Sequence, residues 1–354
     1  AIRAAFKAGQ EGKQVVYLVP TTILAQQHYN TFVQRMKDFP VRVDLLCRFK
    51  TSAEQKKTVE DLKKGLVDVV IGTHRVLSKD VEYKDLGLLI IDEEQRFGVA
   101  HKEKIKKLKE NVDVLTLTAT PIPRTLAATL YGDMDISTIM TMPPGRKPIQ
   151  TRLVEENSLR TIMPQLLDQL EQGGQIYIVC SAIEENENFD GRNVLDIFES
   201  LSEAFSGKAK LGLMHERMSS EEKERAMHDF EANTTQILVS TTVIEVGVNV
   251  VNACCMVIYD AHRFGLSQLH QLRGRVGRGR RQGYCFLLTA SKDPESLARL
   301  KIMEQTTDGF EIAMKDLEQR GPGELLGTRQ SGVPGLILGD LVADTKIIQT
   351  ARQD

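Results

Sequence analysis

Short aliphatic runs alternate with longer stretches of helical spacing along the first third of the chain. The apolar runs are continuous rather than alternating, which is typical of strands buried on both faces of a parallel sheet. They predict strands at Val15–Val19, Val41–Leu46, Val67–Ile71, Leu88–Ile91 and Val114–Leu117. The helical spacing predicts helices at Thr22–Met36, Ser52–Lys64 and Ala100–Lys109. This rhythm indicates right-handed βαβ units and an α/β lobe.

Met142–Pro148 breaks the pattern, because it holds three prolines and a glycine and can form neither a helix nor a central strand. A second alternating series follows this break. It predicts strands at Gln175–Cys180, Lys210–Met214, Gln236–Ser240, Cys255–Tyr259 and Gly283–Leu288, and helices at Asn193–Phe205 and Ser220–Glu231. We therefore expect a first lobe at 1–142, a linker at 143–152, a second lobe at 153–292 and a C-terminal extension at 293–354.

Composition adds little to this division but excludes some classes of protein. Hydrophobic residues make up 41% and charged residues 27% of the 354 residues, as in soluble globular proteins. No apolar stretch is long enough to span a bilayer, so no membrane partner is expected. The five cysteines are an odd count without metal-ligand spacing, which indicates reduced thiols and a cytoplasmic location. The net charge of −2 gives no hint of nucleic acid.

The strand predicted at Leu88–Ile91 ends abruptly in acid, at Asp92-Glu93-Glu94-Gln95. Ligands of open α/β sheets bind at the carboxyl ends of the strands. Two adjacent carboxylates there, Asp92 and Glu93, suit nucleotide hydrolysis, in which one carboxylate holds Mg²⁺ and one orients the attacking water. A solvated acidic turn after a core strand is the alternative.

Arginine and glycine alternate in the second lobe, from Gln271 to Gly279. The glycines permit close approach of the backbone to a ligand, and guanidinium groups bind phosphate as planar forks. Arg275 and Arg278 are three residues apart, so on one helical turn they would face the same way. The alternative is an arginine-rich turn that binds surface carboxylates.

These segments resemble the motifs of superfamily 2 helicases. Gln271-x-x-Gly274-Arg275-x-Gly277-Arg278 resembles motif VI, Asp92-Glu93-Glu94-Gln95 motif II, and Thr118-Ala119-Thr120-Pro121 motif III. The resemblance implies two RecA-like doubly wound parallel-sheet lobes and an ATP-dependent enzyme. It implies ATP and Mg²⁺ as cofactors, with Asp92 as the metal ligand. The catalytic residues it implies are Asp92, Glu93, Arg275 and Arg278, and the nucleotide contacts also include Gln271 and Gly247.

Three further segments resemble the motifs that contact DNA in this superfamily. Val19–Gln27 is similar to motif Ia, Gly72–His74 to motif Ib, and Ser240–Val248 to motif V. With motif III, the resemblance implies DNA-binding and coupling roles for nine residues: Thr21, Thr22, Gln26, Thr73, His74, Thr118, Thr120, Thr241 and Thr242.

Within the superfamily, residues 1–126 resemble the transcription-repair coupling factors, Mfd, and residues from about 127 resemble the RecG family. Phe310–Gly332 resembles the TRG motif that the two families share, which implies a C-terminal helical hairpin and loop with coupling roles for Arg320, Arg329 and Gln330. We therefore expect a monomeric, bacterial double-stranded DNA translocase that acts on branched DNA. An Mfd-type translocase module is the alternative, and only that type would bind RNA polymerase.

A phosphate-binding loop of the form G-x-x-x-x-G-K-[ST] does not occur in the 354 residues. The resemblance places this loop just upstream of Ala1. We expect the 354 residues alone to hydrolyse ATP negligibly and the first lobe to be poorly stable, because an unpaired strand edge would be exposed. An alternative hypothesis, from a different functional class, is therefore that the protein binds DNA without catalysis.

Overall fold

The computed structural model describes residues 1–93, 97, 99–108, 112–119, 135–139, 141, 144–156, 158–181, 194–241 and 249–320. The chain forms two compact units. The first contains Ala1–Ala119, and the second contains the described residues from 135 onward.

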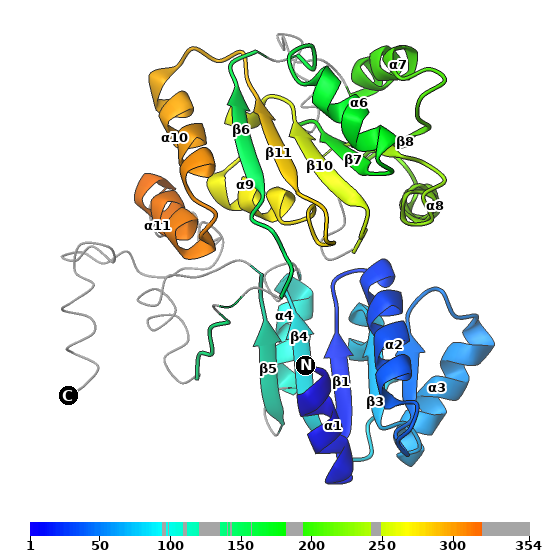
Figure 1. The fold of residues 1–354 in the computed structure, drawn as a ribbon. Helices are drawn as coiled ribbons and strands as arrows, with labels where there is room; N and C mark the ends of the chain where they lie inside the picture. Colours follow the sequence, from blue (N-terminus) through cyan, green and yellow to red (C-terminus); the bar gives the residue numbers. More distant parts are fainter. Residues whose placement is uncertain are drawn as a thin grey trace, which may run out of the picture. The chain divides into compact units, whose positions relative to one another are not determined.

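The first unit is built on a sheet of five parallel strands (Figure 1). The strand order is β2-β3-β1-β4-β5. The bounds are β1 Gln14–Leu18, β2 Val43–Leu46, β3 Val69–Gly72, β4 Leu86–Asp92 and β5 Asp113–Leu117. The helices are α1 Ile2–Gln10, α2 Thr22–Met36, α3 Ser52–Lys64 and α4 Val99–Leu108, with a 3₁₀ turn η1 at His74–Leu77.

Successive residues of the central strands point to opposite faces of this sheet and give the unit two cores. Tyr17 and Ile90 lie in one core, together with buried residues of α1 and α2. Leu18 and Ile91 lie in the other, together with Leu62 of α3 and, from α4, Ile105. Helices therefore cover both faces, which explains why these strands are apolar without interruption.

The second unit contains a sheet of six parallel strands in the order β6-β11-β10-β7-β9-β8 (Figure 1). The bounds are β6 Gln150–Val154, β7 Gln175–Val179, β8 Leu211–Met214, β9 Ile237–Ser240, β10 Ala253–Ile258 and β11 Tyr284–Leu288. The helices are α6 Met163–Glu171, α7 Val194–Ala204, α8 Ser220–Glu231, α9 Leu266–Arg273, α10 Pro294–Gln305 and α11 Gly309–Arg320, with a 3₁₀ turn η4 at Ala261–Arg263.

The expected fold class, two parallel-sheet α/β lobes, is confirmed. The helices expected at Thr22–Met36, Ser52–Lys64 and Ser220–Glu231 occur with those bounds. Two of them begin in capping boxes, where Thr51 and Ser219 cap the helix and a glutamate three residues later bonds back. Residues 150–152, which were expected to lie in the linker, belong instead to β6, because their backbone pairs with β11.

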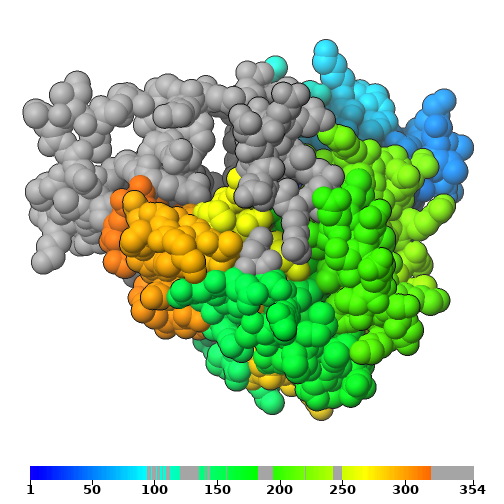
Figure 2. Space-filling view, turned by 90° about the horizontal axis from the view of Figure 1, so that it is seen from above, coloured from blue at the N-terminus to red at the C-terminus, as the bar shows by residue number. Residues whose placement is uncertain are grey.

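The two C-terminal helices α10 and α11 pack on α9, and α10 also packs on β6. Figure 2 shows both helices in orange beside the yellow of α9. The Ser267 hydroxyl of α9 donates a 2.6 Å hydrogen bond to Asp316 Oδ2 of α11. The helical part of the expected extension is thus attached to the same helix that leads into the arginine-rich segment. The loop expected after it, 321–354, lies outside the described residues.

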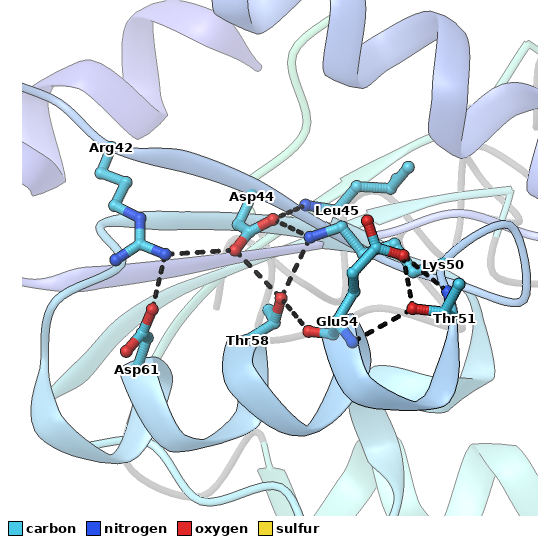
Figure 3. Close-up of polar contacts among 8 residues, drawn as sticks. All are labelled: Arg42, Asp44, Leu45, Lys50, Thr51, Glu54, Thr58 and Asp61. Atoms are coloured by element: carbon cyan, nitrogen blue, oxygen red, sulfur yellow. Dashed lines mark hydrogen bonds and ion pairs between the residues drawn. The ribbon is translucent and has the colours of Figure 1, made fainter.

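A polar cluster fixes the loop that follows β2 in the first unit (Figure 3). Asp44 is only 8% exposed, and its carboxylate forms an ion pair with Lys50 and accepts a 3.0 Å hydrogen bond from the Thr58 hydroxyl. Arg42 lies 3.6 Å from the same carboxylate and 2.6 Å from Asp61. The loop Cys47–Lys50 is therefore held between a strand and α3 by charges that compensate one another.

All five cysteines are buried and free, which confirms the expectation that they lie in the core. In the described part of the chain, no helix combines the length and the apolar character needed to cross a bilayer.

Candidate functional site

The carboxyl ends of β1, β3, β4 and β5 meet at one edge of the first sheet, because these strands are parallel neighbours. Four residues singled out from the sequence lie at or just after these ends: Thr21, Thr73, Asp92 and Thr118. The fold thus brings together segments that are up to about a hundred residues apart in sequence.

Glu93 is tied to the segment that follows β5. Its backbone N–H donates to the Leu117 carbonyl at 2.9 Å, and its carboxylate accepts a 2.7 Å hydrogen bond from the Ala119 N–H. The Thr118 hydroxyl lies 3.5 Å from the same carboxylate. Glu93 is 4% exposed and has a left-handed backbone, with φ of 53°. A non-glycine residue in this conformation is strained, and such strain concentrates at functional sites.

Asp92 is more accessible than Glu93, with its side chain 20% exposed. Its Oδ2 lies 3.5 Å from His28 Nε2, and no Lys or Arg among the described residues forms an ion pair with it. No cluster of three or more possible metal ligands occurs among these residues either. Mg²⁺ is commonly held by one or two carboxylates, with waters and substrate phosphates completing its shell, so a single accessible carboxylate fits this ion.

The segment after β1 turns directly into α2. The Thr21 hydroxyl caps the helix by accepting from the Leu24 N–H at 3.3 Å, and Thr22 is 9% exposed. Gln26 lies one turn further along, and its side-chain amide donates to Asn30 Oδ1 at 3.0 Å. Of these three residues, Thr22 is thus the buried one, whereas Thr21 and Gln26 are half-buried.

Thr73 and His74 follow β3. Thr73 is 7% exposed and precedes the 3₁₀ turn in which His74 lies. The rings of His74 and His101 are 5.2 Å apart. Burial, together with the positive charges of His101 and Lys104, lowers the pKa of His74, which favours the neutral imidazole.

In the second unit, α9 ends at Arg273, and Gly274 forms its C-terminal cap. Arg275 and Arg278 therefore follow the helix, and the expectation that they share a helical turn is wrong. Between them, Gly277 has a left-handed backbone with φ of 66°, a conformation that favours glycine. Arg275 is 5% exposed, and Arg278 Nε donates to the Gly274 carbonyl at 3.1 Å. Burial, and then the neighbouring Arg146, lowers the pKa of Arg278. Gln271 is half-buried on α9.

Arg273 has a structural position that the sequence analysis did not separate from its arginine neighbours. It is 2% exposed, and its Nη1 donates to the carbonyls of Met303 at 2.6 Å and Thr306 at 3.0 Å. Leu266, Leu269 and Arg273 form the buried face of α9. Leu269 follows Leu266 by three residues and Arg273 follows Leu269 by four, and this helical spacing was the available signal that Arg273 points inward.

Thr241 follows β9 and is 2% exposed, with its N–H donating to the Met214 carbonyl at 3.1 Å. Several other candidates lie outside the described residues: Thr120, Thr242, Gly247, Arg329 and Gln330. Arg320 is the last residue of α11, and its side chain lies outside the described part of the chain.

Three family models match the chain in succession. Residues 1–129 match the DEAD/DEAH box helicase model, and 158–280 match the helicase conserved C-terminal domain. Residues 306–354 match the C-terminal part of domain 3 of the ATP-dependent DNA helicase RecG. The chain belongs to the superfamily 2 helicases.

Relatives of two kinds resemble this helicase chain along nearly its whole length. The ATP-dependent DNA helicase RecG of Bacillus subtilis is 48% identical over 354 residues, which is 100% of this chain and 52% of the relative. The transcription-repair-coupling factor of Staphylococcus aureus is 51% identical over 338 residues, 94% of this chain and 28% of the relative. The division expected at residue 126 stays a prediction.

A solved structure of RecG bound to a three-way DNA junction has the same fold. It superimposes with a TM-score of 0.75 at 44% sequence identity and covers 96% of this chain and 44% of the other. The helicase chain thus spans about half the length of the RecG relatives that it matches.

Proposed function

We propose that the protein is an ATP-dependent translocase and helicase of RecG type that moves on double-stranded DNA and acts on branched DNA. The observation that carries this proposal is the order of three matching models, two helicase domains followed by the RecG-specific C-terminal part, on one chain. Identity to RecG along the whole chain supports it. The proposal includes the domain limits given above, a monomeric state and a bacterial cytoplasmic location.

The first lobe supplies the hydrolytic carboxylates in this proposal. Asp92 would hold Mg²⁺, which neutralises phosphate charge when it is bound. Glu93 would orient the attacking water. In the present conformation the Ala119 N–H donates to Glu93 Oε1 and so helps to set the direction in which the carboxylate would face the attacking water. The contact gives the segment at Thr118 a direct means of controlling the nucleotide site.

The second lobe supplies the positive charge. Arg275 and Arg278 would contact the ATP phosphates, with Gln271 and Gly247 as further nucleotide contacts. An arginine that stabilises the transition state of phosphoryl transfer contributes about 10³- to 10⁵-fold in rate. The turn at Gly277, rather than a helix, then sets the spacing of the two guanidinium groups.

DNA contacts would come from loops at the strand ends and from the C-terminal extension. We assign this role to Thr21, Thr22, Gln26, Thr73, His74, Thr118, Thr120, Thr241, Thr242, Arg320, Arg329 and Gln330. Hydroxyls, amides and arginines of this kind bind phosphate oxygens, so binding should be independent of sequence and weaken with salt.

A second candidate is an Mfd-type translocase module, which the 51% identity to a transcription-repair-coupling factor favours. That relative is matched over 28% of its length, whereas RecG is matched over 52%. RNA polymerase would be a partner in this case only. A DNA-binding module without catalysis is the candidate of another class.

The experiment compares full-length wild-type protein with the Asp92→Asn variant on two substrates. One is a three-way DNA junction, and the other is a stalled RNA polymerase on duplex DNA. The RecG-type proposal expects ATP-dependent unwinding of the junction that Asp92→Asn abolishes, without release of polymerase. Release of polymerase instead would establish the Mfd-type reading. Binding of the junction without ATP hydrolysis would establish that the protein is a DNA-binding module without catalysis.

A further inference from the structure

Tyr17, His28 and Asp92 form a chain of contacts in the first unit. His28 Nε2 lies 3.4 Å from the Tyr17 hydroxyl oxygen and 3.5 Å from Asp92 Oδ2. The ring centroids of Tyr17 and His28 are 4.7 Å apart, and those of Tyr17 and Phe32 are 5.6 Å apart. The three residues come from β1, α2 and β4, so the contact depends on the tertiary fold.

The sheet register places Tyr17 and Asp92 on the same face. Tyr17 is paired with Ile90 across the neighbouring strands β1 and β4. Asp92 lies two residues after Ile90, and residues two apart in a strand point to the same face. Asp92 therefore extends the row of side chains that α2 covers.

His28 lies in the buried stripe of α2. It is four residues after Leu24 and four before Phe32, and both of these side chains are buried. An apolar residue at this position would satisfy packing alone. The chain instead has an imidazole, with its side chain 29% exposed, next to a carboxylate.

Tyr17 keeps its proton in this environment. Burial, and to a smaller extent the negative charge of Asp92, raises the pKa of the Tyr17 hydroxyl above its ordinary value. A neutral hydroxyl at 3.4 Å can fix the plane of the imidazole without adding charge to the site.

We infer that His28 is a positioning residue for Asp92: its Nε2 edge orients the carboxylate, and Tyr17 holds the imidazole in place. The inference rests on the proposed function, in which Asp92 is the Mg²⁺ ligand. Residues that orient a metal-ligating side chain contribute about 10- to 100-fold to metal affinity. Because α2 begins at Thr21, the helix with the proposed DNA contacts also carries this residue.

The test measures metal affinity separately from nucleotide affinity. The full-length protein is titrated with Mn²⁺·ADP, and electron paramagnetic resonance gives the Kd of the complex. The Kd of ADP without metal is measured in the presence of a chelator. His28→Ala should raise the Kd of Mn²⁺·ADP about tenfold and leave the Kd of metal-free ADP unchanged. His28→Gln, which keeps an N–H donor, should recover part of the affinity, and Tyr17→Phe should have a smaller effect than His28→Ala.

The control is His228→Ala, which removes a histidine whose side chain is 80% exposed on α8 and should bind like wild type. Wild-type Mn²⁺·ADP affinity in His28→Ala would overturn the inference. It would also be overturned if His28→Gln lost as much affinity as His28→Ala and both variants melted earlier to the same extent. Asp92→Asn tests the premise separately, because wild-type metal affinity in that variant contradicts the metal assignment and leaves no ligand for His28 to position.

Discussion

The Glu93 carboxylate accepts a hydrogen bond from the Ala119 N–H, with 2.7 Å between Glu93 Oε1 and the nitrogen. The contact joins the acidic end of β4 to the segment after its neighbour β5, two regions about 25 residues apart in sequence. Since Glu93 is also held in a left-handed backbone conformation, its carboxylate is aimed by the main chain as well as by this bond.

Glu93→Gln should abolish ATP turnover without loss of the fold. The amide keeps an oxygen that can accept from the Ala119 N–H but cannot act on water as a carboxylate does. We expect the DNA-stimulated ATPase rate of the full-length protein to fall about 10²- to 10⁴-fold. Retained affinity for ADP and DNA would show that the variant has lost the hydrolysis step and not ligand binding. Wild-type turnover would exclude Glu93 as the water-orienting residue.

Arg278→Ala and Arg329→Ala should separate hydrolysis from movement. Loss of Arg278 should reduce the ATPase rate about 10³-fold or more while DNA binding persists, because its proposed partner is phosphate of ATP. Arg329→Ala should leave hydrolysis intact and impair unwinding of a three-way junction. The two assays are run on both full-length variants. An equal loss of both activities in both variants contradicts the role assignments.

The packing of α9 on α10 should weaken below pH 6.5. Burial, and then the Arg273 charge, lowers the pKa of His270 to about 4, and its Nδ1 lies 3.1 Å from Arg273 Nη2. Since the folded pKa is below the unfolded value of about 6.5, the unfolded state binds the proton better. The stabilisation is present above pH 6.5 and falls as the pH decreases toward 4, by up to on the order of 3 kcal/mol.

Hydrogen exchange measured by mass spectrometry between pH 7 and pH 5 checks this expectation. Rates corrected for intrinsic pH dependence should rise in peptides that cover α9 and α10. His270→Gln should flatten this dependence, and His228→Gln on the exposed face of α8 should not change it. Equal protection at both pH values in wild type would exclude His270 as the cause.

Asp44→Ala should destabilise the first unit by about 3 kcal/mol, because it removes the carboxylate that forms an ion pair with the half-buried Lys50. Urea unfolding followed by circular dichroism measures the loss, since the chain contains no tryptophan. Lys63→Ala breaks an exposed ion pair with Glu82 and should cost less than about 1 kcal/mol. Similar losses in the two variants would show that the Asp44 cluster has no special stabilising role.

The helices with regular apolar spacing could be predicted from the sequence. The elements next to proline-rich or glycine-rich segments could not. α2, α3 and α8 have the expected bounds because their caps and apolar spacing are local properties of the sequence. β6 was missed because its residues follow a proline-rich segment and contain polar side chains, so only pairing with β11 makes them a strand. The turn at Arg275–Arg278 was wrongly expected to be helical, since glycine spacing alone does not show where α9 ends.

The sequence by itself determined the order of the parallel-sheet units and the residues that bear charge or hydroxyls at the strand ends. These follow from hydrophobic periodicity and from the rule that parallel strands present their carboxyl ends at one edge. Only the tertiary structure decided which side chains meet. His28 reaches Asp92, and Arg273 turns inward to α10, because strand register and helix packing set distances between residues far apart in the chain.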